Sequence, residues 1–378
     1  MKIVYCLNSI QETGGIASAI KLKANALSEK GHKVFILVSD HNPNKENNLF
    51  KNVKLINLDI NYYKDDWKSK FNVIRGVIIK RKHHKKKLTQ ILNQINPDIV
   101  ISAGQSEKYF LPSIKGTWKT IREFHFDKNY RLRYADSFLQ KVIAHIVNFY
   151  DYGFKIKKYD RIVVLTEEDK IINWNNDPKI HVIPNPIYIS SSYLATNGGK
   201  RVIAVGRLVK EKNYSSLIRA YRMVAESHPD WKLEIYGQGQ LMDSLKEEIK
   251  KNNLSDNIEL MGYHSNITEI LKDFSIFVMT SLYEGLPMSI LEAMSVGLPI
   301  VSYDCPYGPR NLITDGETGY LVPLNNENIL AQRINELIEN QDLRKRYGEN
   351  AFLHSKNYSI EQISSKWVNL FENLLNNY

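Results

Sequence analysis

Apolar residues along the chain gather in short runs that alternate with stretches of helical spacing. Residues 3–7 form one such run, and apolar residues then recur at Ile16, Ile20, Ala24 and Leu27, the spacing of one helix face. Runs without polar alternation are typical of strands buried on both faces of a parallel sheet, with helices between the strands. Further strands predicted in the first half are residues 34–38, 53–57, 98–102, 120–124 and 161–165.

The same α/β alternation restarts after a segment rich in Pro, Ser, Asn and Gly. Residues 185–200 are therefore predicted to link a first domain, 1–184, to a second, 201–357. Residues 358–378 contain a last helix with an apolar stripe that has to be buried. Strands predicted in the second half are residues 202–205, 232–236, 258–261, 274–280 and 299–303.

The most informative stretch follows the apolar run of residues 274–280. Pro287 suits the first position of a helix. This places Glu284 in the turn before the helix, beside free backbone N–H groups, and Glu292 about two turns deeper. Ligands of open α/β sheets bind at the carboxyl ends of strands, and a helix N-terminus attracts phosphate or hydroxyl oxygens. The stretch therefore predicts a polar binding pocket.

Glycines and cations follow several other predicted strands. Arg207 and Lys212 suit a diphosphate, because Arg offers planar paired donors and Lys a point charge. Gly14 and Gly15 let backbone approach a phosphate or another domain, although they lack the dinucleotide-binding spacing and a plain tight turn is an equal alternative. His125 ends a strand, where an imidazole can donate to a phosphate or handle a proton near neutral pH. Weaker signals at the same edge come from Gly237, Gly262 and Tyr263.

Positive charge predominates, with 51 Lys and Arg against 41 Asp and Glu, which favours an anionic partner. Residues 64–87 are dense in cations interleaved with aromatic and aliphatic residues. This segment suits an anionic membrane surface, and a solvated helix with its apolar stripe facing the core is an equal alternative. Nucleic acid is disfavoured because no readout motif surrounds the cluster. The cations assigned to the membrane and acceptor side are Lys80, Arg81, Lys82, Lys85, Lys86 and Lys87.

Cysteine usage and hydropathy indicate the compartment. Only two cysteines occur, Cys6 and Cys305, so a disulfide framework is not expected and a reducing cytoplasm is favoured. Residues 1–7 are strand-like and lack the apolar region of a signal peptide, and no run of about 18 apolar residues occurs. The expectation is a cytoplasmic protein, peripheral on the inner face of the cell membrane.

Several of these motifs together resemble the retaining glycosyltransferases of family four. They are Glu284 and Glu292 with seven residues between them, the Gly-Leu-Pro after Glu284, Gly206-Arg207 with Lys212-Asn213 downstream, and Asp315-Gly316-Glu317-Thr318-Gly319. The resemblance runs nearly end to end. It implies the GT-B fold, with two doubly wound Rossmann-like domains facing across a cleft. The first domain would bind the acceptor and the second the nucleotide sugar, and the last helix would pack on the first domain.

The resemblance also implies roles for individual residues. Glu284 would hydrogen-bond hydroxyls of the donor sugar and Glu292 the ribose, while Arg207 and Lys212 would neutralise the leaving diphosphate. Gly15 would approach that diphosphate, and His125 would lie near the reacting sugar. The implied catalytic residues are Glu284, His125, Arg207 and Lys212. The implied donor site adds Gly15, Gly237, Gly262, Tyr263, Gly285, Leu286, Pro287, Met288 and Glu292.

The sequence thus predicts a retaining transferase that moves a hexose or N-acetylhexosamine from a UDP-sugar to a lipid-linked oligosaccharide in cell-surface polysaccharide biosynthesis. Neither a metal nor a cofactor is expected, because Arg and Lys would take the metal's place and no Asp-X-Asp motif occurs. A non-catalytic nucleotide-sugar-binding subunit and a UDP-sugar epimerase of the same fold stay open as alternatives. One departure from the family pattern is Asn311, which stands where many members carry a carboxylate; this resembles a subset among capsule, O-antigen and exopolysaccharide transferases.

Overall fold

The computed structural model describes residues 1–10, 15–40, 52–62, 70–133, 135, 137–189, 195 and 198–376, with the backbone alone for 70–75. These residues form two compact units. The first comprises Met1–Pro186 and Ile363–Tyr378, and the second Ile187–Gln362. Gly14 and the first part of the cationic segment, residues 64–69 and the side chains of 70–75, lie outside the described residues.

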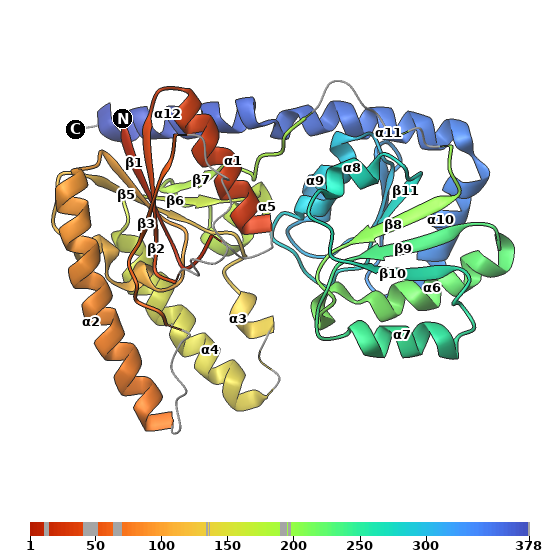
Figure 1. The fold of residues 1–378 in the computed structure, drawn as a ribbon, viewed down its shortest axis with the longest axis horizontal. Coiled ribbons are helices and arrows are strands. Elements are labelled where there is room, and N and C mark those ends of the chain that lie inside the picture. The colour runs from red at the N-terminus through yellow and green to blue at the C-terminus, as the bar shows by residue number, and fades with distance from the viewer. Residues whose placement is uncertain are drawn as a thin grey trace. The chain divides into compact units, whose positions relative to one another are not determined.

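A seven-stranded sheet forms the centre of the first unit, with strand order β3-β2-β1-β4-β5-β6-β7 (Figure 1). All its pairings are parallel; Ile3 of β1, for example, lies opposite Val34 of β2 and Ile99 of β4. The central strands are buried on both faces, which explains their continuous apolar runs. The strands are β1 Lys2–Leu7, β2 Lys33–Val38, β3 Lys54–Asn57, β4 Ile99–Ser102, β5 Lys119–Glu123, β6 Arg161–Val164 and β7 Ile180–Val182.

Helices cover both faces of this sheet. Alternate residues of β1 face opposite sides, so Tyr5 joins a core with Ile20 of α1, whereas Val4 joins one with Leu88 and Leu92 of α2. The α-helices of the first unit are α1 Gly15–Glu29, α2 Lys70–Ile95, α3 Tyr130–Arg133, α4 Phe138–Tyr150 and α5 Glu167–Trp174. Short helical turns are η2 Glu107–Tyr109, η3 Leu111–Ser113, η4 Asp151–Lys155 and η5 Ile156–Lys158.

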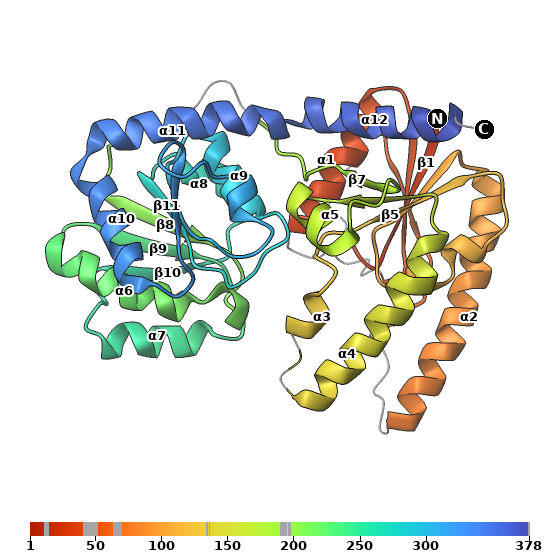
Figure 2. The same ribbon diagram turned by 180° about the vertical axis from the view of Figure 1, so that it is seen from behind.

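Helix α12, Ile360–Asn376, completes the core of the first unit. Figures 1 and 2 show it running along this unit close to α1. Trp367 and Phe371 are fully buried in the same core as Ile3 and Ile20. The apolar stripe of this helix therefore belongs to the interior of the first unit, although the whole second unit precedes it in the sequence.

The second unit has a six-stranded parallel sheet of order β10-β9-β8-β11-β12-β13. Its helices pack around a core that includes Leu217, Tyr221 and Leu337. The strands are β8 Arg201–Val205, β9 Lys232–Tyr236, β10 Ile258–Gly262, β11 Ile276–Met279, β12 Ile300–Tyr303 and β13 Gly319–Val322. The helices are α6 Tyr214–Ser227, α7 Met242–Lys251, α8 Ile267–Leu271, α9 Met288–Ser295, α10 Glu327–Glu339 and α11 Gln341–Ser355, with the turns η6 Lys210–Lys212, η7 Pro309–Asn311 and η8 Lys356–Tyr358.

The placement of Pro287 as the first helical residue is wrong. Its ψ of 108° is extended, so it is the N-cap and α9 begins at Met288. Its carbonyl already accepts from the amides of Ile290 and Leu291, at 3.2 and 3.3 Å, as an N-cap carbonyl does. Strands β7 and β13 were not predicted, because three residues are too few for a pattern and Gly319 was assigned to a turn motif.

Candidate active site

Lys212 and Glu284 form an ion pair in the second unit, with Lys212 Nζ 2.5 Å from Glu284 Oε1. Lys212 ends turn η6 after β8, and Glu284 lies in the loop after β11. Two hydrogen bonds join these segments: Leu282 N donates to Glu211 O at 2.8 Å, and Thr280 Oγ1 donates to Lys212 O at 3.1 Å. These hydrogen bonds fix a cation beside a carboxylate at the carboxyl edge of the sheet, where a diphosphate and a hydroxyl can be bound together.

Arg207 lies on the same loop as Lys212, but its guanidinium contacts Glu211 and not Glu284. It is exposed, and its Nη2 lies 3.2 Å from Glu211 Oε1. The Arg207 side chain is 60% exposed, whereas that of Glu211 is 14% exposed. The exposed guanidinium is therefore accessible to a phosphate.

Glycines allow the loops after β8 and β9 to touch through their backbones. Gly206 N donates to Tyr236 O at 3.0 Å, and Gly237 N donates to Gly262 O at 2.8 Å. A Cβ on Gly237 would lie 1.8 Å from Gly206 O, at a φ of +154°. Because Gly237 has no Cβ, the two backbones can make this contact. The contact sets the position of the loop that carries Arg207.

Replacing Gly237 by Ala should lower the free energy of unfolding by about 2 kcal/mol, because the new Cβ overlaps backbone that has to shift. Gly262→Ala is the matched control. Its φ is also positive, at +76°, but a Cβ there meets nothing within 4 Å, so a cost of about 1 kcal/mol from the backbone conformation alone is expected. Urea unfolding of both variants measures the difference, and equal costs would contradict the packing role of Gly237.

Glu292 lies on α9, about one turn beyond the helix start at Met288. Burial raises the pKa of its carboxyl from 4.5 to about 7. No cation in the described part of the chain offsets that burial. A carboxyl whose charged form is disfavoured in this way gains from a bound hydroxyl that donates to it.

The loop of residues 307–311 packs against the Glu284 turn. A Cβ on Gly308 would lie 2.8 Å from both Glu284 Cβ and Pro287 Cδ. Asn311 Nδ2 donates to Tyr307 O at 3.0 Å, and Tyr307 has a left-handed φ of +69°. Asn311 thus holds a strained turn against Glu284. This contact gives a structural role to Asn311, the residue that departs from the family pattern.

In the first unit, His125 lies in a buried polar cluster at the end of β5. Its Nε2 is 3.6 Å from Glu123 Oε1, which also accepts from Lys23 Nζ of α1. Neither ring nitrogen has a hydrogen-bond partner among the described residues. Burial lowers the pKa of His125 to about 4, although Glu123 raises it. Burial therefore favours the neutral form of the ring, which can donate or accept a hydrogen bond.

Comparison with known proteins identifies the family. The model described as Glycosyltransferase Family 4 matches residues 13–191, and the one described as Glycosyl transferases group 1 matches residues 189–354. A glycosyltransferase of Methanocaldococcus jannaschii is 30% identical over 343 residues, which cover 78% of this chain and 83% of that protein. The chain belongs to glycosyltransferase family 4.

Further similarities of this family 4 glycosyltransferase concern a bacterial enzyme and a solved structure. The poly(ribitol-phosphate) alpha-N-acetylglucosaminyltransferase of Staphylococcus aureus is 34% identical over 242 residues, 61% of this chain and 49% of that protein. The pneumococcal O-GlcNAc transferase GtfA, solved with UDP and GlcNAc, has a TM-score of 0.77 at 17% identity, covering 100% of this chain and 99% of that one. With the two parallel sheets, this confirms the predicted GT-B fold.

The other predicted donor-site residues of the glycosyltransferase lie at the expected edges of the two units. Gly15 begins α1 and is exposed, and Tyr263 is exposed just after β10. Residues 285–288 connect Glu284 to α9, with Leu286 buried. No group of three or more His, Cys, Asp or Glu side chains is arranged to hold a metal ion within the described ranges.

The interpretation of the cationic segment as a helix with a core-facing stripe applies to the later half of α2. His84, Leu88 and Leu92 are buried, so the later half of the helix packs on the core. Lys80 Nζ and Lys87 Nζ donate to Asn61 O and Leu58 O, at 2.6 and 2.8 Å, and so tie α2 to its own unit. The remaining cations, Arg81, Lys82, Lys85 and Lys86, are exposed. In the part of the chain that the structure describes, no helix is long and apolar enough to span a membrane.

Sequence reasoning missed Lys23 and Glu123, the buried pair beside His125. A signal was present for Lys23, which falls three residues after Ile20 and four before Leu27, within the apolar stripe of α1. A charge at a core position of a helix requires a buried partner. Glu123 gave no such signal, because it lies at the end of a strand.

Proposed function

We propose that this glycosyltransferase transfers a hexose or N-acetylhexosamine from a UDP-sugar to a lipid-linked oligosaccharide in cell-surface polysaccharide biosynthesis, with retention and without a metal. The observation that carries the proposal is the Lys212–Glu284 pair, whose two loops are joined by the hydrogen bonds from Leu282 N and Thr280 Oγ1. The UDP and GlcNAc bound by GtfA and the sugar named for the S. aureus relative support a nucleotide sugar as donor.

In the proposed reaction, the bond between C1 of the sugar and the β-phosphate oxygen breaks, and its electron pair stays on the phosphate. Lys212 and Arg207 stabilise this growing negative charge more than they stabilise the bound donor, which is the condition for faster turnover. The acceptor hydroxyl attacks C1 from the same face and gives its proton to the departing phosphate oxygen. No protein base is needed for this step, because the departing phosphate oxygen takes the proton.

The other residues position the substrates. Glu284 accepts hydrogen bonds from sugar hydroxyls, and Glu292 accepts from the ribose. On the family resemblance, Gly15 contacts the diphosphate and His125 the transferred sugar. The second unit would bind the donor and the first the acceptor, with the exposed cations of α2 on an anionic membrane at the cytoplasmic face.

Release of nucleotide from a panel of UDP- and GDP-sugars tests the reaction. The wild-type protein should release UDP from one of the UDP-sugars in the presence of an acceptor extract. Glu284→Ala should lower this rate by about 100-fold or more while UDP still binds, because its carboxylate contacts the sugar. UDP binding without turnover of any donor would favour the non-catalytic subunit, and interconversion of two UDP-sugars would favour the epimerase.

A further inference from the structure

Helix α4 turns its apolar side chains to solvent. Within it, Ala144 and Asn148 are the buried residues, whereas Phe138 is 84% and Ile146 63% exposed. At 3.6 residues per turn the exposed apolar side chains cover about 140° of the helix with no polar residue among them. They are Phe138, Leu139, Val142, Ile143, Ile146, Phe149 and Tyr150. A face of this size on a protein surface marks an interaction site.

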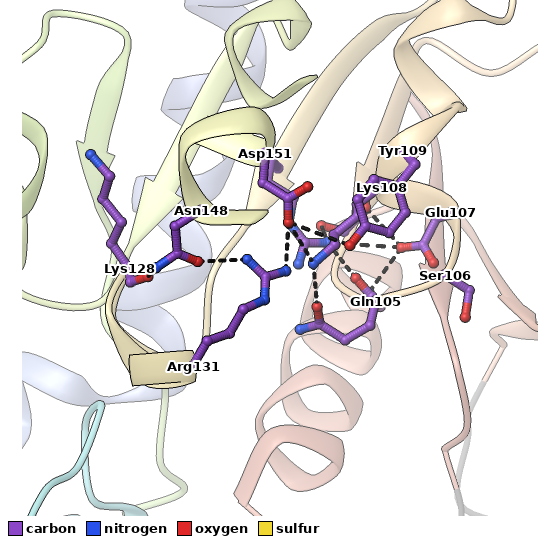
Figure 3. Close-up of polar contacts among 12 residues, drawn as sticks. Gln105, Ser106, Glu107, Lys108, Tyr109, Lys128, Arg131, Asn148 and Asp151 are labelled. Carbon is purple, nitrogen blue, oxygen red and sulfur yellow. Dashed lines mark hydrogen bonds and ion pairs between the residues drawn. The ribbon is translucent and has the colours of Figure 1, made fainter. Parts of the chain in front are cut away.

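A polar network fixes this orientation of α4 (Figure 3). Arg131 donates to Asn148 Oδ1 at 2.7 Å and to Asp151 Oδ2 at 2.5 Å. Lys108 Nζ lies 3.6 Å from the same Asp151 oxygen, and Asp151 is buried. Rotating α4 to bury its apolar face would separate these groups and leave buried charges unpaired, at a high cost. The apolar face is therefore held outward.

Helix α4 is also stabilised at its N-terminal end. Ser137 Oγ accepts from Gln140 N at 3.2 Å, and Gln140 Oε1 accepts from Ser137 N at 3.1 Å, which is a capping box. At the other end the apolar surface continues into η4, where the Phe154 ring is 5.7 Å from that of Phe149. The surface is thus an ordered element of about four turns rather than a frayed end.

The same unit presents positive charge on α2, which is linked to the end of α4. Neither α4 nor α2 contains an Asp or Glu, and both helices extend past the sheet in the same direction (Figures 1 and 2). The Arg81 guanidinium of α2 lies 4.4 Å from the Tyr109 ring centroid, and the Tyr109 hydroxyl donates to Asp151 at the end of α4. Ile78, Ile79, Lys82 and Lys86 are exposed on α2.

The positive charge of α2 beside the apolar face of α4 favours one kind of binding partner over another. A second copy of the chain would bring two cationic surfaces together, which is unfavourable. An anionic phospholipid bilayer instead offers hydrocarbon to the apolar side chains and phosphates to the cations, as interfacial helices require.

We propose that α4 inserts its apolar face into the interfacial region of an anionic phospholipid bilayer, while the exposed cations of α2 contact the headgroups. The proposal deepens the membrane association proposed above and rests on it for the sign of the lipid charge. It assigns the element that enters the bilayer, and it predicts that a hydrophobic contribution to binding persists when salt screens the cations.

Sedimentation with vesicles of phosphatidylglycerol and phosphatidylcholine tests the proposal. Ile146→Asn should weaken binding about tenfold or more at low and at high salt, because one buried Ile side chain changes an equilibrium by roughly that factor. Leu353→Asn on α11 is the matched control, since Leu353 is 58% exposed and lies in the second unit; it should bind like the wild type. Lys82→Glu with Lys86→Glu should weaken binding mainly at low salt.

A site-specific dye provides the second measurement. Both native cysteines are buried, so Ile146→Cys can be labelled selectively, with Leu353→Cys as control. The dye at position 146 should shift to shorter wavelength when anionic vesicles are added. Unchanged vesicle binding of Ile146→Asn with weakened binding of the Lys82/Lys86 variant would overturn insertion by α4 while leaving the cationic association intact. A shift without vesicles that grows with protein concentration would assign the face to self-association and overturn the proposal. Neither readout depends on sugar transfer.

Discussion

Replacing Lys212 by Ala should lower kcat for sugar transfer by about 100- to 1,000-fold, with a much smaller change in KM. The reason is that negative charge develops on the departing diphosphate in the transition state. A fixed cation there lowers the barrier more than it strengthens donor binding. Steady-state kinetics with the active UDP-sugar measure the two parameters separately.

Lys210→Ala is the control for this variant. Lys210 lies on the same turn, η6, and is exposed, whereas Lys212 is held by Glu284. Lys210→Ala should change kcat by less than about threefold, as expected for a solvated cation. A change in KM alone for Lys212→Ala would place its charge in ground-state binding and contradict the proposed role in catalysis.

Glu292→Gln should stabilise the protein at pH 8 and weaken nucleotide binding. Burial raises the pKa of Glu292 from 4.5 to about 7, so between these pH values the folded protein keeps a proton that the unfolded chain has released. The stabilising contribution of that proton is complete below about pH 4.5 and is lost as the pH rises through about 7. A tenfold change in proton affinity corresponds to about 1.4 kcal/mol, so the variant should gain about 3 kcal/mol at pH 8 and almost nothing at pH 4.5.

Urea unfolding at the two pH values measures this gain, and calorimetry with UDP measures the expected loss of affinity, about tenfold for one hydrogen bond to a charged group. Glu247→Gln is the matched control, since Glu247 is an exposed carboxylate on helix α7 of the same unit. It should leave both quantities unchanged. A gain of equal size at both pH values would show that packing rather than charge accounts for the effect of Glu292→Gln.

The fold was predictable because the buried strands of a parallel sheet appear in the sequence as continuous apolar runs. The predicted run at residues 98–102 appears as β4, and that at 161–165 as β6. Element ends were less well predicted, as for Pro287, because a proline fixes φ but leaves ψ to tertiary contacts. Here the loop at Gly308 packs against its ring.

Two residues predicted for the site, each in a loop that follows a strand, lie together in the structure. Lys212 and Glu284 meet because a parallel sheet gathers the carboxyl ends of β8 and β11 at one edge. The contact of Arg207 with Glu211 and the buried charge cluster around His125 depend on side-chain placement and could not be read from spacing.

The orientation of α4 shows a different limit. Apolar residues at helical spacing are ordinarily assigned to the core, and the α4 sequence fits that pattern. The outward orientation follows from Arg131, which binds Asn148 and Asp151 on the opposite face. Such long-range polar contacts are absent from the local sequence, so the periodicity identifies the helix but not the side that faces the protein.

The position of α12 has a consequence for how the protein is made. Domains usually fold one after another as they leave the ribosome, but the first unit lacks Trp367 and Phe371 until the whole second unit has been synthesised. Part of the apolar surface of its sheet therefore stays exposed while the second unit is synthesised. That takes about 180 residues of synthesis at roughly 5–20 residues per second. The second unit can complete its core during that interval, so the part of the protein that is translated first is the last to reach its final structure.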